Sequence, residues 1–169
     1  MNPPPSKTSG RPFVISRTFN APRELVWQAW TDPRHKGWWG PKGVTIHHAK
    51  LDLRPGGTFH YGMKTPEGRE MWGKWVIREI HKPEVLVFVS SFSDEAGGLA
   101  RHPLSPHWPL EMLTTVTFVA QGGNTLLTIQ WLPLDPAEIE RKTFDEGHES
   151  MKNGWTGTLD RLAEYLAHA

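Results

Sequence analysis

The sequence predicts an α+β fold in which an antiparallel sheet packs against one long C-terminal helix. Two observations predict it: six strand-like stretches follow one another between residues 44 and 134, and the residues from 136 onward change to helical spacing. The separators RPGG, TPEG, HKPE and QGG are typical of tight turns and hairpins. Strands joined by such short turns pair antiparallel, so we expect a meander.

An N-terminal arm, 1–12, precedes the expected single domain, 13–169. The arm holds four prolines among polar residues, which makes it too polar and too stiff to pack, so we expect it to be disordered. The domain begins with a strand over 13–20, where branched and aromatic residues follow strand spacing, and continues with a short helix over 21–31. Pro22 suits the first turn of that helix because the turn needs no N–H there.

A segment rich in glycine and proline, 32–43, follows this helix and carries the adjacent Trp38 and Trp39. Its composition predicts a turn or a single helical turn. The strands that follow are expected at 44–53, 58–64, 70–80, 85–92, 111–120 and 124–134. A long connection, 93–110, interrupts them, and because loops of this length are uncommon unless they cover or gate something, we expect a lid or an interface there.

From Pro136 to the C-terminus, apolar residues recur every three or four positions, which predicts an amphipathic helix lying on the sheet. The stripe comprises Phe144, His148, Met151, Trp155, Leu159, Leu162 and Leu166. Gly147, Gly154 and Gly157 fall within the same segment. Two interpretations stay open: Gly147 breaks the segment while the other two permit close approach to the sheet, or these glycines make room for a ligand.

The composition argues against several function classes. A net charge of +1 with scattered Lys and Arg offers no patch for nucleic acid, and no window is long and apolar enough for membrane insertion, so a cytoplasmic protein is expected. The absence of cysteine excludes disulfides and thiolate ligands. Nine histidines without HxH or HExxH spacing predict no metal site, and no motif predicts a cofactor. His47 and His48 are strand neighbours and should point to opposite faces.

Nine tryptophans and seven phenylalanines are a large supply of apolar rings, and alternation along the strands directs many of them to one face. The inward set that would touch a ligand, if a pocket exists, is Phe59, Tyr61, Met63, Trp75, Phe88, Met112, Trp131, His148, Met151 and Trp155. Trp38, Trp39 and Trp108 lie outside the strand stripes and are candidates for a cavity mouth, although loop anchoring or an oligomer contact explains them equally well.

No sequence motif names a reaction. The chain has serines and acids but no GxSxG turn, so catalytic residues are unknown and a binding protein is favoured over an enzyme. His148 lies on the helical stripe, where it would be either a buried histidine satisfied by a strand or a ligand contact or general base. Asp52 and Glu79 stand within strand patterns and would either reach a cavity or stay solvent-facing and ion-paired. His148, Tyr61 or a strand carboxylate would orient a ligand.

Several segments together resemble a known superfamily. They are PRELVWQAWTDP, WWGPKG, DLRPGGTFHYGM with TPEG, WGKWVIREI with PEVLVF, and SMKNGWTGTLDRLAEYL, in consistent order from about Phe13 to Leu166. This pattern is similar to the SRPBCC or START-like helix-grip superfamily, and within it to the stand-alone bacterial-type members of the branch named after the activator of the heat-shock protein 90 ATPase. The resemblance implies a curved antiparallel sheet of about six to seven strands wrapped around the C-terminal helix.

The resemblance also implies a hydrophobic cavity, which superfamily members use for lipids, polyketides and other apolar molecules. The leading interpretation is therefore that a small apolar or aromatic ligand binds between the sheet and the C-terminal helix. The alternatives are a co-chaperone-like protein-interaction module with a chaperone partner and a cyclase- or hydrolase-like enzyme acting on an apolar substrate. A homodimer is compatible with each of them.

Overall fold

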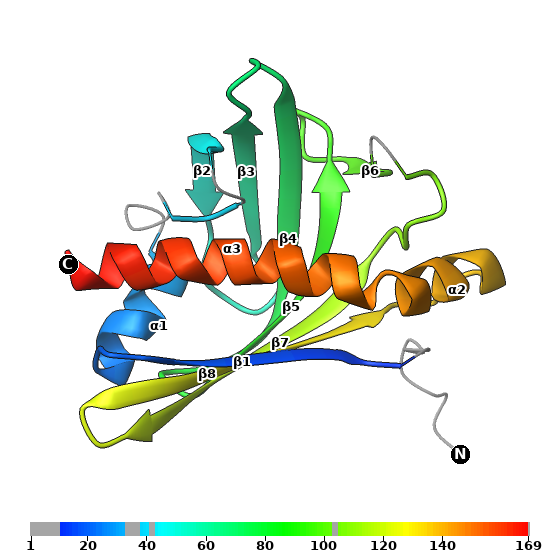
Figure 1. Ribbon diagram of the computed structural model, residues 1–169. Helices are drawn as coiled ribbons and strands as arrows, with labels where there is room; N and C mark the ends of the chain where they lie inside the picture. The colour runs from blue at the N-terminus through cyan, green and yellow to red at the C-terminus, as the bar shows by residue number, and fades with distance from the viewer. Residues whose placement is uncertain (1–10, 33–37, 41–42, 103–104, 169) are drawn as a thin grey trace.

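One antiparallel sheet runs through the molecule and bends around the C-terminal helix (Figure 1). The computed structural model describes residues 11–32, 38–40, 43–102 and 105–168. The sheet consists of β1 (Phe13–Phe19), β2 (Thr45–Leu51), β3 (Thr58–Lys64), β4 (Glu70–His81), β5 (Val85–Ser93), β7 (Met112–Gln121) and β8 (Asn124–Pro133) in the order β1-β8-β7-β5-β4-β3-β2. The two-residue β6 (Leu99–Ala100) pairs with β5.

The predicted α+β fold is confirmed, and each expected strand is present with its ends shifted by only one or two residues. The strands from β2 to β8 form the expected meander, and β1 closes the order by pairing along β8. The sequence did not predict β6, because two residues within 93–110 are too few to show alternation. Residues 1–10 of the predicted arm lie outside the described part of the chain.

The C-terminal segment forms two helices, α2 (Glu138–Glu146) and α3 (His148–Ala167), and Gly147 separates them as the first interpretation of that glycine expects. The Gly147 N–H bonds the Phe144 oxygen at 3.0 Å, which tightens the last turn of α2. The Trp108 ring packs so closely here that a Cβ on Gly147 would lie 3.1 Å from it. The predicted stripe from Phe144 to Leu166 therefore belongs mainly to α3, which crosses the inner face of the sheet (Figure 1).

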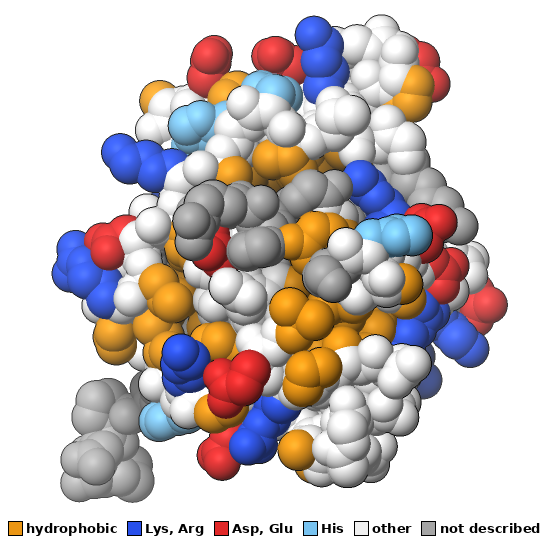
Figure 2. Space-filling model, turned by 90° about the vertical axis from the view of Figure 1, so that its left-hand side faces the viewer, with side chains coloured by type: hydrophobic (Ala, Val, Ile, Leu, Met, Phe, Trp, Pro, Cys, Tyr) orange, Lys and Arg blue, Asp and Glu red, His pale blue; other side chains and the backbone are white. Residues whose placement is uncertain are grey.

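A short helix, α1 (Arg23–Thr31), packs at one end of the sheet against β7 and β8. Beside α1 runs a shallow groove, here called the α1–β2 groove, lined by Pro22, Leu25, Trp27, Leu51 and Leu53 with Glu24, Gln28, Thr31, Asp32 and Lys82. Figure 2 shows the face of the molecule on this side, where hydrophobic side chains gather centrally and charged side chains lie mostly around them. None of the described helices combines the length and hydropathy needed to cross a bilayer.

Aromatic rings make up much of the core, and Trp75 on β4 lies at their centre. Its ring stacks on Phe88 of β5 with centroids 3.9 Å apart and meets the edge of Phe59 of β3 at 4.7 Å. Trp30 of α1 stacks on it from the helical side at 6.1 Å. All four side chains are at least 99% buried. Trp75 thus joins three strands and one helix, as the alternation of large residues on one face requires.

The outer face of the sheet corrects the expectation that His47 and His48 point to opposite sides. The register between β2 and β3 shifts between Ile46 and His48, which is a β-bulge. Both imidazoles consequently lie beside Trp72 of β4, with ring centroids 5.1 and 5.6 Å away. In the described residues, no group of three or more His, Asp or Glu side chains is arranged to hold a metal ion.

Candidate ligand-binding cavity

A cavity of about 240 Å³ lies between the inner face of the sheet and α3. An apolar cavity of about 150 Å³ is large enough to bind benzene, so this one has room for roughly two fused rings. Ten of the residues that the sequence predicts as ligand-binding or cavity-mouth candidates line the cavity: Trp39, Tyr61, Met63, Trp75, Phe88, Trp108, Met112, Trp131, Met151 and Trp155. The space therefore lies where the inward stripes of strands and helix face each other.

The sheet side of the cavity follows from strand alternation. Tyr61 and Met63 are two residues apart on β3, so both project inward, and Trp75, Phe88 and Met112 do the same from β4, β5 and β7. Each of these side chains is at most 8% exposed. Large apolar side chains from four neighbouring strands thus form a continuous concave wall.

The helix side of the cavity is built from α3 at helical spacing. Met151, Trp155 and Thr158 are four and three residues apart, so they share one face of the helix. Gly154 also lines the cavity, and a Cβ placed on it would meet no atom within 4 Å. Gly154 is exposed and the space beside it is open, so it does not mediate close helix–sheet approach.

A segment that includes Trp39 and Gly40 closes one side of the cavity. Arg161 on α3 holds this segment, because its guanidinium donates hydrogen bonds to the carbonyl oxygens of Trp39 and Gly40 at 3.3 and 3.0 Å. Burial lowers the pKa of Arg161, as expected for a cation withdrawn from water. The Trp39 ring then reaches inward and packs against Trp75 and Trp155 at 5.3 and 5.8 Å.

Residues 108–110 of the long connection form another wall of the cavity. The Trp108 ring lies 6.0 Å from Phe144 of α2, and Arg101 donates a 3.4 Å hydrogen bond to the Trp108 oxygen. Arg101 also forms an ion pair with Glu140, whose carboxylate accepts the Ala137 N–H at 2.8 Å where α2 begins. Burial raises the pKa of Glu140, but the Ala137 and Arg101 hydrogen bonds outweigh it and hold this pKa below its usual range.

Two nominated aromatic residues, Phe59 and Trp38, lie in the core behind the cavity rather than on its surface. Phe59 is fully buried, with its ring stacked 5.0 Å from that of Tyr61. Trp38 is 2% exposed, its indole N–H donates to the Ala29 oxygen at 3.1 Å, and its ring packs on Trp30 at 5.1 Å. The adjacent Trp38 and Trp39 are both buried because the first points toward α1 and the second toward α3.

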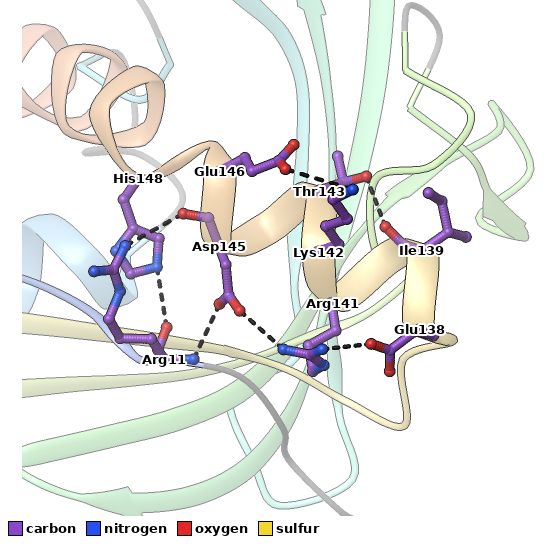
Figure 3. A network of polar contacts seen from close by, with 9 residues as sticks. All are labelled: Arg11, Glu138, Ile139, Arg141, Lys142, Thr143, Asp145, Glu146 and His148. Carbon is purple, nitrogen blue, oxygen red and sulfur yellow. Dashed lines mark hydrogen bonds and ion pairs between the residues drawn. The ribbon is translucent and has the colours of Figure 1, made fainter.

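His148, the nominated polar residue of the helical stripe, also lies away from the cavity. It is the first residue of α3, and its Nε2 lies 3.0 Å from the Arg11 oxygen (Figure 3). The ring contacts Phe13 and Phe144 at 5.8 and 5.1 Å. Figure 3 shows the same junction joined by Asp145, which accepts the Arg11 N–H at 3.0 Å. The break at Gly147 places His148 at the N-terminal end of α3, away from the cavity. In one continuous helix, His148 would have faced the sheet.

The two strand carboxylates remain at the surface. Asp52 pairs with Arg54 at 2.7 Å, and Glu79 pairs with His81 at 3.1 Å. More than half of each acidic side chain is exposed. Of the polar groups that could orient a ligand according to the sequence, Tyr61 is the one that lines the cavity.

Several lining residues were not nominated from the sequence. They are Gly40, Ser90, Ser91, Phe92, Pro109, Leu110, Thr114, Gly154 and Thr158. Alternation predicts an inward side chain at Ser90 and at Thr114, because each lies two residues from a predicted inward residue, Phe88 or Met112. Helical spacing predicts the same for Thr158. Large rings are the stronger sequence signal for an apolar cavity, and small polar residues at the same spacing are a weaker one.

Tyr61 combines burial with a polar group. Burial raises its pKa to about 12, although a hydrogen bond with the Trp39 side chain acts in the opposite direction. The ring extends across β4 at Gly73, where a Cβ would lie 2.3 Å from the Tyr61 oxygen. Gly73 therefore provides the space in which the phenol lies, and the phenol stays neutral at physiological pH.

A bent antiparallel sheet that encloses an apolar cavity with a long C-terminal helix defines a helix-grip domain. Residues 20–167 match the family described as activator of Hsp90 ATPase homolog 1-like protein. The chain belongs to this family, a branch of the SRPBCC superfamily. No curated protein matches the chain.

Many solved structures share the fold. A crystal structure of a Mycobacterium smegmatis protein is 26% identical, with a TM-score of 0.72, over 96% of this chain and 94% of that one. A crystal structure of a Nitrosomonas europaea protein is 25% identical, with a TM-score of 0.73, over 93% of this chain and 94% of that one. A solution structure of an Arthrobacter aurescens protein is 25% identical, with a TM-score of 0.74, over 94% and 87%.

Gly73→Ala is expected to destabilise the protein by about 1–3 kcal/mol, because the added methyl group overlaps the Tyr61 hydroxyl. Gly123→Ala is the matched control, since a Cβ there meets nothing within 4 Å, and its effect should stay within about 0.5 kcal/mol. Urea denaturation measures both values. Equal effects of the two substitutions would contradict the packing of Tyr61 over Gly73.

The raised pKa of Tyr61 predicts a loss of stability in alkali. The folded-state pKa of about 12 exceeds the ordinary value of 10.0, so folding favours the protonated phenol. The stability that this preference contributes is fully present below pH 10 and is lost as the pH rises toward 12. Ultraviolet titration of tyrosinate in the wild type and in Tyr61→Phe isolates the transition, because Tyr165 is the second of two tyrosines. A Tyr61 transition near pH 10 would show that the phenol is solvated.

Proposed function

We propose that this protein binds a small hydrophobic or aromatic molecule in the cavity between the sheet and α3. The observation that carries the proposal is the unfilled space of about 240 Å³ whose walls are mostly aromatic and aliphatic side chains. Pockets with apolar walls and a few polar groups are typical ligand sites. The family match supports the same class of function through its fold.

The driving force would be burial of the ligand's apolar surface. A two-ring molecule buries on the order of 300 Å², which corresponds to about 7 kcal/mol before the cost of association is subtracted. An affinity no tighter than micromolar follows for an unsubstituted hydrocarbon. Polar contacts would then determine orientation and selectivity.

The walls would need little rearrangement to receive a ligand. Trp39, Trp75 and Trp155 hold one another through ring contacts, and Arg161 fixes the backbone of Trp39. Because these rings are already ordered, binding does not have to meet the entropic cost of ordering them. Met63, Met112 and Met151 also line the cavity, and their flexible thioethers adapt to ligands of different outline.

Gly154→Leu is expected to weaken binding of 2-acetylnaphthalene at least about tenfold, because Gly154 lines the cavity and a leucine side chain adds bulk at this wall. Gly157→Leu is the matched control: it lies on the same helix, a Cβ there also meets nothing within 4 Å, and Gly157 does not line the cavity. Titration followed by the indole N–H signals in ¹H–¹⁵N NMR spectra gives both affinities.

Thermal unfolding of both leucine variants serves as the folding control, since both should be at least as stable as the wild type through better helix propensity. Equal affinity in Gly154→Leu and Gly157→Leu would place the ligand elsewhere. A screen of neutral aromatic and aliphatic molecules in which none perturbs Trp39, Trp75 or Trp155 would contradict the cavity proposal as a whole.

A second candidate function is a protein-interaction module of the Hsp90-activator type. The family description motivates it, and the α1–β2 groove, with Leu53 40% exposed, supplies an apolar surface outside the cavity. Stimulation of the ATPase of purified Hsp90 that Leu53→Asp abolishes would support this function. Stimulation that is unaffected by Leu53→Asp, or no stimulation, would count against the groove as the contact.

A further inference from the structure

The polar side-chain groups on the described cavity wall are uncharged: they are hydroxyls and indole N–H groups. In the described lining, the remaining side chains are aromatic or aliphatic, and the hydroxyls belong to Tyr61, Ser90, Ser91, Thr114 and Thr158. Such a wall solvates a carbonyl or an ether oxygen through hydrogen bonds, but it gives a full charge little compensation for leaving water. The wall therefore favours an uncharged ligand with limited polarity.

Most of these hydroxyls already have hydrogen-bond partners within the protein. Ser90 Oγ and Thr114 Oγ1 lie 3.0 Å apart and share a hydrogen bond across β5 and β7, which uses the proton of one of the two hydroxyls. Thr158 Oγ1 donates to the Gly154 oxygen at 3.2 Å within α3. Ser91 follows the inward Ser90 directly in β5, so it contributes its backbone to the cavity wall while alternation turns its hydroxyl to the other face of the sheet.

Tyr61 differs because its partner, the Trp39 side chain, can only donate. The Trp39 side chain offers only an indole N–H, so the Tyr61 oxygen must accept in that hydrogen bond and its own proton is not used in it. Burial keeps the phenol protonated, and the Trp39 bond together with the space at Gly73 fixes where its oxygen lies. The indole N–H groups of Trp75 and Trp131, further donors on this wall, are fully buried and so out of reach of a ligand in this packing.

We infer that the ligand is a neutral aromatic molecule of about two rings whose carbonyl-type oxygen accepts a hydrogen bond from the Tyr61 hydroxyl. This inference rests on the proposed function and names the ligand class for the same cavity. Tyr61 acts as the selectivity-determining residue: the aromatic walls bind the rings, and the phenol distinguishes an oxygen acceptor from a hydrocarbon group of the same shape. Removal of a buried donor would leave a bound carbonyl without a partner.

A matched pair of probes tests the inference. 2-Acetylnaphthalene carries a carbonyl oxygen, and 2-isopropenylnaphthalene has a methylene group in its place with nearly the same outline. Tyr61→Phe should weaken binding of the ketone about fivefold and change binding of the olefin less than about twofold. The infrared carbonyl stretch of the bound ketone should lie lower in the wild type than in Tyr61→Phe.

Tyr165→Phe is the control variant, because Tyr165 lies on α3 outside the cavity lining and its substitution should change neither affinity. The anion 2-naphthoate should bind at least about tenfold more weakly than the ketone. Equal effects of Tyr61→Phe on both probes, or binding of 2-naphthoate as tight as that of the ketone, would overturn the inference and leave the cavity proposal intact. Absence of binding by both neutral probes would count against the proposed function itself.

Discussion

The structure depends on the rigidity of its tryptophan side chains. The indole rings between the sheet and α3 are planar and cannot change shape to fill the space around them. Trp30 and Trp155 stack with centroids 6.4 Å apart, and Trp39 packs edge-on against Trp75 and Trp155. These contacts join α1, β4 and α3 through ring atoms. Because aromatic pairs favour offset and edge-to-face arrangements, such a cluster holds α3 away from the sheet. The cavity is the space that the rings leave between the two layers.

The same constraint explains why residues distant in the chain are needed to complete the walls. Arg161 fixes the carbonyl groups at Trp39 and Gly40, and Arg101 links the segment around Trp108 to Glu140 of α2. Each arginine donates hydrogen bonds to backbone carbonyl groups of an irregular segment. The helices therefore have two roles: α3 covers the sheet, and both α2 and α3 hold the segments that enclose the cavity.

Much of the fold could be predicted from the sequence because alternation and helical spacing are local signals. The strands and the inward positions of Tyr61, Trp75 and Phe88 follow from period two alone. Features that depend on distant contacts could not be predicted in this way: the bulge at His47, the displacement of His148 by the break at Gly147, and the packing of Trp38 against α1. Thr114 follows the same alternation, two residues from Met112, but a small polar side chain gives a weaker signal for an apolar cavity than a large ring does.

The most direct test of the account is a crystal of the protein exposed to xenon under pressure, because xenon occupies apolar cavities without requiring a specific ligand. The account predicts an anomalous xenon peak between α3 and the sheet, in contact with Met151, Trp155 and Met112, with little change in the surrounding rings. A structure in which these side chains close over the space and no xenon enters would contradict the claim that the protein keeps an apolar cavity under its C-terminal helix.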